Sequence, residues 1–327
     1  MIWHPIVLSI LVCDSFVFFL LLFSMKPLFQ VILHWSPEDS SQRQLALEPR
    51  FEVATIQNIL AFFLFSCSTI LIFFAISSVL PATIPGAMCG TGAMEAMGAH
   101  GIRALITRFM VLTLFYIFYQ LFLIARSTPR GRFQTQIAKI LILVFPILLL
   151  SIYETIQAFW GINMATPVDC CAAIYDTIRA PSGGSVFNIY TLPAWLTRWG
   201  SPFFSVCLIL TAVLSKRRQW LLIPISLFWI MASYVLLINH LLPYHYGVLS
   251  HSCPWCIFGV EHSFQGFPIL FCMLAVTWAC IKIVLSRYAA NRYSKPTTLI
   301  FSIFLFYAFS SWPSVIWYIS RGTWIQS

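Results

Sequence analysis

Long apolar runs, separated by short polar stretches, dominate this chain. Each run comes close to the ~20 residues that a helix needs to cross the hydrocarbon core of a bilayer. We expect eight such helices, at residues 5–24, 54–80, 104–125, 138–159, 199–215, 219–241, 265–285 and 298–318. The pattern therefore predicts an all-α, polytopic transmembrane bundle, with residues 1–327 forming a single integral membrane domain.

The composition agrees with a lipid bilayer as the main partner. The chain is 60% hydrophobic and 9% charged, whereas a soluble domain carries about 25% charged residues. No Lys/Arg-rich stretch with interleaved aromatic residues is present, so we expect no nucleic-acid partner. The first residues lack the basic segment and the small-residue cleavage site of a signal peptide, so the first apolar run is expected to remain as a membrane helix.

Loop charge predicts how the helices are oriented. The loops after the third, fifth and seventh runs are basic and contain no Asp or Glu; their basic residues are Arg126, Arg130, Arg132 and Lys139, then Lys216, Arg217 and Arg218, then Lys282, Arg287, Arg292 and Lys295. Because positive loops stay in the cytoplasm, we expect an inner-membrane protein with these loops inside. Both termini and the loops 81–103, 160–198 and 242–264 would then be extracytoplasmic, and 160–198 is long enough for a small lobe.

The ten cysteines divide into two sets. Five fall inside the apolar runs and are interpreted as small packing residues: Cys13, Cys67, Cys207, Cys272 and Cys280. The other five fall on the predicted extracytoplasmic side, where disulfides persist in bacteria: Cys89, Cys170, Cys171, Cys253 and Cys256. Six of the seven histidines also lie at or near this face. Thiols and imidazoles are therefore concentrated on the predicted extracytoplasmic side, opposite the basic loops.

The most informative motif is the C-x-x-C pair formed by Cys253 and Cys256. Two intervening residues allow the sulfurs to meet. If Cys256 lies in the first turn of the next helix, the helix dipole favours its thiolate. Trp255 would lie at interface depth, where an aromatic ring can contact a quinone. A structural disulfide or a metal clip is the alternative, and we favour a redox role.

The run from His251 to Phe258, which leads directly into a membrane helix, resembles the quinone-side motif of the DsbB and vitamin K epoxide reductase families. The resemblance covers some thirty residues, around 250–280. It implies a four-helix core in which Cys253 and Cys256 are the quinone-proximal pair. It also implies that a second cysteine pair, in an outer loop, exchanges with a soluble thioredoxin-like partner. Quinone is the cofactor that this resemblance predicts.

Cys170 and Cys171, preceded by Asp169 in the long outer loop, are candidates for that second pair. Adjacent cysteines form a strained, labile disulfide, which suits a shuttle. Equally, one of the two can pair with Cys89 and staple two loops. We expect Cys89 itself to lie near the start of a helix over 93–109, as a fifth participant.

Three further residues complete the predicted site. Trp255, Arg108 and His262 are expected to contact the cofactor. Arg108 lies close to the hydrocarbon, where an arginine is costly, and it can either hold a polar head group or extend to the interface. Glu154 is a second polar residue inside a span, interpreted as either a proton carrier or a hydrogen-bonded interfacial acid.

The leading hypothesis is a membrane thiol–disulfide oxidoreductase that exchanges electrons with a quinone or a thioredoxin-like protein. The first alternative is a copper transport or delivery factor, because thiols, thioethers and imidazoles are soft ligands suited to Cu(I); its further ligands would be Met88, Met94, Met97 and His100. The second alternative is an anchor subunit of a respiratory complex, with a cytochrome as partner. Cys256 is followed by Ile257, so the C-x-x-C-H motif of covalent haem is missing there.

Overall fold

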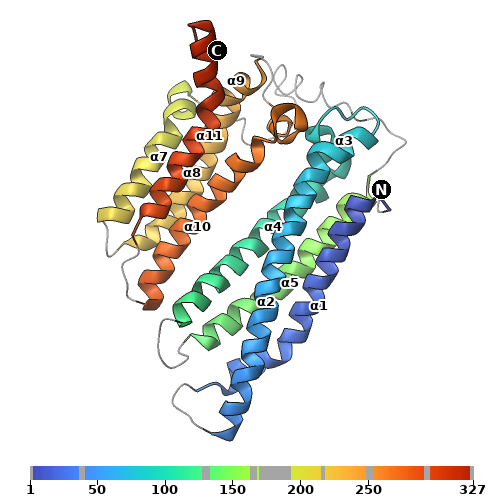
Figure 1. The fold of residues 1–327 in the computed structure, drawn as a ribbon, viewed down its shortest axis with the longest axis vertical. Coiled ribbons are helices and arrows are strands. Elements are labelled where there is room, and N and C mark those ends of the chain that lie inside the picture. The colour runs from blue at the N-terminus through green and yellow to red at the C-terminus, as the bar shows by residue number, and fades with distance from the viewer. Residues whose placement is uncertain are drawn as a thin grey trace. The chain divides into compact units, whose positions relative to one another are not determined.

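The computed structural model describes residues 3–36, 41–126, 133–162, 168, 193–214, 218–247, 253–290 and 295–324. Within them, eight helical segments are long and apolar enough to cross a membrane, which confirms the predicted all-α multi-pass bundle (Figure 1). The long helices are α1 (Pro5–His34), α2 (Gln42–Phe74), α4 (Gly90–Arg126), α5 (Gln134–Trp160), α7 (Ala194–Leu214), α8 (Leu222–Leu236), α10 (Gly266–Ala290) and α11 (Thr297–Arg321).

Short elements extend two of the spans. A π-helical turn, Ala75–Val79, and the short helix α3 (Leu80–Thr83) continue α2. A second π-helical turn, Leu237–Leu241, and the short helix α9 (Leu242–Tyr246) continue α8. Turns of this kind are rare and are found often at functional sites.

Several helices run well beyond the predicted spans, because hydropathy marks only the part that lies in hydrocarbon. The start of α1 is fixed by His4, whose side chain accepts a hydrogen bond from the Ile6 amide at 3.3 Å. The start of α2 is fixed by Ser41, whose hydroxyl accepts from the Gln44 amide at 3.4 Å. Such side chains satisfy the amides that the first turn leaves without partners, so α2 begins twelve residues before the predicted residue 54.

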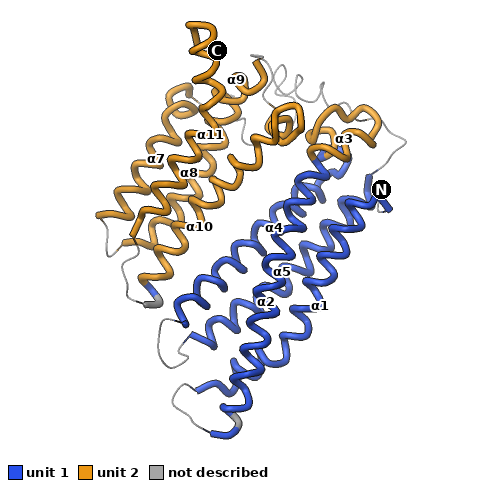
Figure 2. Tube along the Cα trace, viewed as in Figure 1, with its two compact units in different colours: residues 1–76, 94–166, 288–291 blue, residues 77–93, 167–287, 292–327 orange. Residues whose placement is uncertain are grey.

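The chain divides into two compact units, shown in blue and orange in Figure 2. Unit 1 comprises residues 1–76, 94–166 and 288–291, and unit 2 comprises 77–93, 167–287 and 292–327. The chain therefore leaves unit 1 after α2, contributes 77–93 to unit 2, and returns to unit 1 within α4. That residues 1–327 form one domain stays a prediction, and most of the expected lobe at 160–198 lies outside the described residues.

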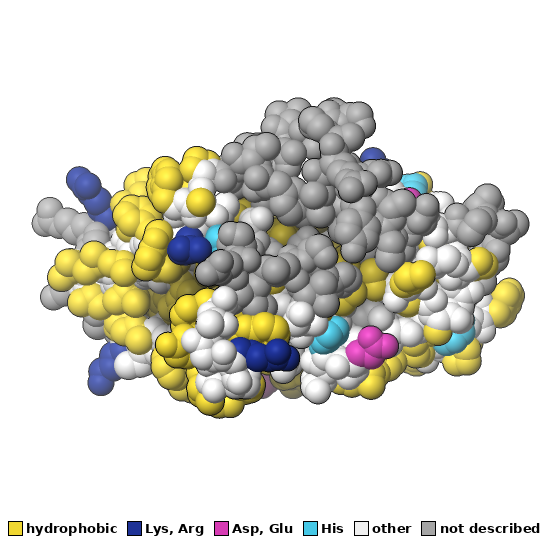
Figure 3. Space-filling model, turned by 90° about the horizontal axis from the view of Figure 1, so that it is seen from above, with side chains coloured by type: hydrophobic (Ala, Val, Ile, Leu, Met, Phe, Trp, Pro, Cys, Tyr) yellow, Lys and Arg dark blue, Asp and Glu magenta, His cyan; other side chains and the backbone are white. Residues whose placement is uncertain are grey.

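Large hydrophobic side chains cover much of the described surface (Figure 3). Phe16, Phe63, Phe203 and Phe304 are all at least half exposed, as expected for helices that face lipid. Among the cysteines of the spans, Cys272 and Cys280 are buried, which confirms the packing interpretation for those two. Cys67 is exposed, so that interpretation is wrong for Cys67.

Candidate thiol site

Cys89 is positioned in unit 2 by a tight turn that follows α3. Gly86 has a φ of +80°, and an added Cβ would lie 2.3 Å from the Val168 carbonyl oxygen, so this position requires glycine. The Val168 amide donates to the Pro85 carbonyl at 3.0 Å and holds the turn. Cys89 then directly precedes α4, which confirms its predicted place at a helix start.

Cys253 and Cys256 lie in an irregular segment between α9 and α10. Cys256 opens a 3₁₀ turn, Cys256–Phe258, and a second turn, Val260–His262, follows. The long helix α10 begins only at Gly266, so Cys256 does not lie in its first turn, and the condition for a dipole effect of this helix on the Cys256 thiolate is not met. The reason is the two consecutive left-handed residues Ser263 and Phe264, with φ of 53° and 55°, which separate the C-x-x-C segment from the helix.

A close contact between Gly90 and Trp255 joins the two segments. A Cβ built on Gly90 would lie 2.9 Å from Cβ of Trp255, so the indole packs against bare backbone. Tyr246 donates a hydrogen bond to the Cys253 carbonyl from the other side. These contacts bring Cys89, Cys253 and Cys256 together, with their sulfur atoms all within 4.8 Å of one another.

The buried sulfur at the centre of the cluster is that of Cys253, whose residue is 1% exposed. It lies 3.5 Å from the Cys89 sulfur and 3.0 Å from the Thr91 hydroxyl. Hydrogen bonds from Cys256 above all, and then from Cys89 and Thr91, lower the pKa of Cys253 to about 3. The same arrangement raises the pKa of Cys256, because its proton is held in the hydrogen bond to Cys253. These hydrogen bonds therefore favour the thiolate on Cys253 over Cys256, whereas the sequence favoured Cys256 only if that residue lay in the first turn of a helix.

The Thr91→Val variant should raise the pKa of Cys253, because it removes a hydrogen bond to a charged sulfur worth about 1.5–3 kcal/mol. The pKa of Cys253 is lowered from 9.0 in the unfolded chain to about 3 in the folded protein. The thiolate therefore stabilises the fold fully when the pH is above the pKa of the unfolded chain, and this stabilisation is lost as the pH falls through the pKa of the folded protein. The variant should therefore melt below wild type at neutral pH, with the difference shrinking as the pH approaches the folded value. Thermal unfolding across this range measures it. Thr83→Val is the matched control, because the Thr83 hydroxyl donates to the Val79 and Leu80 carbonyls and not to a sulfur among the described residues; an equal pH trend there would contradict the prediction.

A cavity of about 340 Å³ opens beside the cluster. Cys89 and Cys256 line it, together with Met88 and Glu261, whereas Cys253 does not. Ser77 and Ser78 also face it, and both belong to the π-helical turn that continues α2. The cluster thus has an outer side with two sulfurs and an inner side with one.

The other predicted site residues lie in different surroundings. Trp255 packs on Gly90 and contacts the Phe258 ring, with 5.8 Å between centroids. His262 contacts the Tyr246 ring at 4.7 Å and lines a second cavity, of about 330 Å³, with His245 and Trp317. Cofactor contact stays a prediction for both. Cys170 and Cys171 lie outside the described residues.

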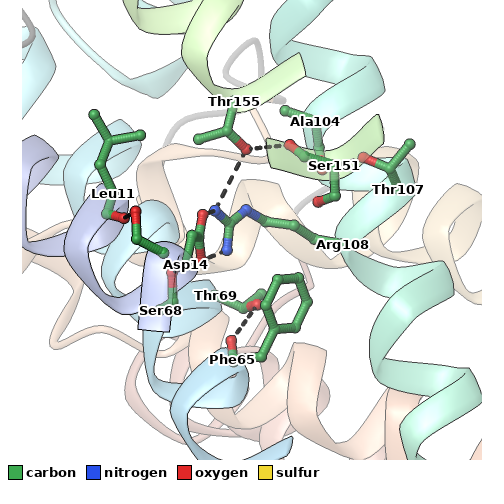
Figure 4. Close-up of polar contacts among 11 residues, drawn as sticks. Leu11, Asp14, Phe65, Ser68, Thr69, Ala104, Thr107, Arg108, Ser151 and Thr155 are labelled. Carbon is green, nitrogen blue, oxygen red and sulfur yellow. Dashed lines mark hydrogen bonds and ion pairs between the residues drawn. The ribbon is translucent and has the colours of Figure 1, made fainter. Parts of the chain in front are cut away.

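Arg108 is held inside unit 1 by the three helices around it (Figure 4). Its guanidinium pairs with Asp14 of α1 and donates to Ser68 of α2 at 3.0 Å and to Thr155 of α5 at 3.3 Å. Ser68 also donates to Asp14, at 2.6 Å. Arg108 is fully buried, so it does not extend to the interface, and the snorkelling interpretation is wrong. Its expected contact with a cofactor stays a prediction.

Sequence reasoning missed Asp14 and Thr91. Asp14 lies within an apolar run, and an acid there is costly unless it is paired, which was the available signal. Thr91 gave no signal, because its role depends on a cysteine far away in the chain. Glu154 and His100 are hydrogen-bonded to each other at 2.7 Å, which agrees with the hydrogen-bonded interpretation of Glu154.

Comparison of this chain with protein-family models, with curated proteins and with solved structures gave no match.

Proposed function

We propose that this multi-pass membrane protein is a thiol–disulfide oxidoreductase whose redox pair is Cys253 and Cys256. The observation that carries the proposal is the convergence of three sulfurs within 4.8 Å, one of them deeply buried. Oxidation of the pair forms one S–S bond and releases two electrons and the one proton of Cys256, because Cys253 is favoured as the thiolate. The electrons pass to a quinone or to the disulfide of a thioredoxin-like protein, and the reverse direction uses the same groups.

The proposal includes an orientation in the inner membrane. The three basic loops would lie in the cytoplasm, which puts Cys89 and the C-x-x-C segment on the oxidising side, where disulfides persist. Cys89 serves as a third sulfur that donates to Cys253 in the reduced state and can exchange with the pair. The loop cysteines, Cys170 and Cys171, are proposed as the shuttle that meets the soluble partner.

Alkylation mapping of the purified full chain, in glutathione buffers of graded potential, tests the redox pair. Cys253 and Cys256 should convert together from two alkylatable thiols to a disulfide, in a single two-electron transition. Cys253→Ala or Cys256→Ala should abolish the transition. Cys207→Ala, at a half-buried cysteine of α7, should leave it unchanged. If Cys253 and Cys256 stay reduced at every potential, the proposal is wrong.

A soft-metal site is the second candidate, because the same cluster offers three ligands to one ion. Thiolates select Cu(I), and Met88 lines the adjoining cavity. Titration of the reduced chain with Cu(I) under anaerobic conditions, against a competing chelator, decides between the two. Tight binding that needs all three cysteines, together with no disulfide in any redox buffer, would favour metal delivery over electron transfer.

A further inference from the structure

The three sulfurs of the cluster are not equivalent toward a substrate. Cys89 and Cys256 line the cavity, whereas Cys253 is 1% exposed and does not. In a disulfide between Cys253 and Cys256, an incoming sulfur can therefore reach only Cys256. Displacement at Cys256 expels the Cys253 sulfur, which the Thr91 hydroxyl at 3.0 Å is placed to stabilise as a thiolate.

The cavity has the size and chemistry of a small-molecule site. Its volume, about 340 Å³, lies at the lower end of the range of about 300–1,000 Å³ for ligand pockets. The lining residues with polar or ionisable side chains are Ser77, Ser78, Cys89, Cys256 and Glu261. Among the described residues that line it, Glu261 bears the one formal charge, so the cavity favours cations.

The π-helical turn at Ala75–Val79 is a second, independent sign of a built site. It interrupts the α-helical path between α2 and α3 just where Ser77 and Ser78 meet the cavity. A regular helix would direct these two neighbouring hydroxyls differently, and turns of this type are frequent at functional sites.

We propose that this cavity binds a small cationic thiol, or the disulfide that such a thiol forms, and that the sulfur of this ligand exchanges with Cys256 while Cys253 remains the internal partner. The inference rests on the proposed redox function and names its substrate class. On this proposal, soluble protein partners react with the loop cysteines Cys170 and Cys171, and the cavity admits only small thiols and their disulfides.

The exchange balances without another reactant. A substrate thiolate attacks the Cys256 sulfur, the Cys253–Cys256 bond breaks, and Cys253 leaves as a thiolate while a mixed disulfide forms on Cys256. A second substrate thiolate attacks the substrate sulfur of that mixed disulfide and releases Cys256, which takes up a proton. Two substrate thiols become one substrate disulfide, and the protein gains the two electrons.

The experiment uses the reduced full chain carrying Cys89→Ser and Cys253→Ser, with cystamine as a cationic disulfide and dithiodiglycolate as an anionic one. Mass spectrometry follows adduct formation. We expect a stable cysteamine adduct on Cys256. The rate of each reagent with the protein is divided by the rate of the same reagent with free cysteine, and on this scale cystamine should react about tenfold faster than dithiodiglycolate. Glu261→Gln should bring this ratio close to one. A matched variant, Cys253→Ser with Cys256→Ser, reports on Cys89, which should react more slowly.

Two results would overturn the inference: faster reaction at Cys89, or no preference for the cation. If the variants do not fold, the wild-type chain is treated with cationic and anionic methanethiosulfonates, and the cysteine modified first is identified. The redox titration of wild type on the same preparation separates the two proposals. A Cys253–Cys256 disulfide that forms while the cavity fails these tests removes the inference alone, and a disulfide that never forms removes both.

Discussion

The Asp14→Asn variant is expected to lose about 3–5 kcal/mol of unfolding free energy. Asparagine keeps the shape of the side chain but removes the charge that balances Arg108, which is 0% exposed. The guanidinium would then be a buried cation whose remaining partners are the Ser68 and Thr155 hydroxyls, and its position above the Phe65 ring, at 5.1 Å, does not replace a counter-charge. Denaturant titration in mixed micelles measures the loss.

Two further variants make this prediction specific. Glu95→Gln applies the same chemical change at an exposed acid of α4 and should stay within about 0.5 kcal/mol of wild type. The double variant, Asp14→Asn with Arg108→Gln, should lose less than the sum of its single variants, because contacting residues couple. Strictly additive losses would contradict a paired, buried charge.

The Gly90→Ala variant is expected to slow disulfide formation between Cys253 and Cys256 by about a hundredfold. The added Cβ would lie 2.9 Å from the Trp255 Cβ and 3.1 Å from two atoms of its ring, so the indole and the backbone that carries both cysteines must shift. A displacement of about 1 Å in a reacting group costs on the order of a hundredfold in rate. Stopped-flow oxidation of the reduced chain, monitored by alkylation, measures it.

Gly200→Ala is the matched control for this variant. Gly200 lies in α7 of the same unit, and its added Cβ would make an ordinary contact with Ala232 at 3.5 Å. This change should leave the oxidation rate unchanged. Wild-type rates in Gly90→Ala would mean that the contact with Trp255 does not position the cysteines.

The elements that the sequence predicts best are those decided by one local property. Apolar length alone identifies the spans, because a helix must be about 20 residues long to cross hydrocarbon. Caps such as Ser41 explain where α2 begins, and the hydropathy pattern does not include them. The turn that separates Cys256 from α10 depends on the left-handed backbone of Ser263 and Phe264. Serine and phenylalanine rarely adopt this conformation, so the sequence does not predict it.

The candidate site could be predicted only in part, for a similar reason. The C-x-x-C pair is visible because its members are three residues apart. Cys89 joins it across a sequence separation of 164 residues, and that meeting depends on Gly90 accepting the Trp255 indole. The pairing of Asp14 with Arg108 spans 94 residues. The sequence therefore indicates that each charge is costly inside an apolar run, but it does not indicate which residue pairs with it.

The sequence distance between Cys89 and Cys253 also has a consequence for biosynthesis. Ribosomes add about 5–20 residues per second, so the 164 residues between the two cysteines take about ten to thirty seconds to make. During that interval Cys89 has been synthesised, whereas Cys253 and Cys256, which lie beside it in the folded protein, have not. A nascent chain that stalls before Cys253 therefore carries a cysteine open to wrong partners, and the cluster can assemble only after translation has passed Cys256, beyond the end of α9.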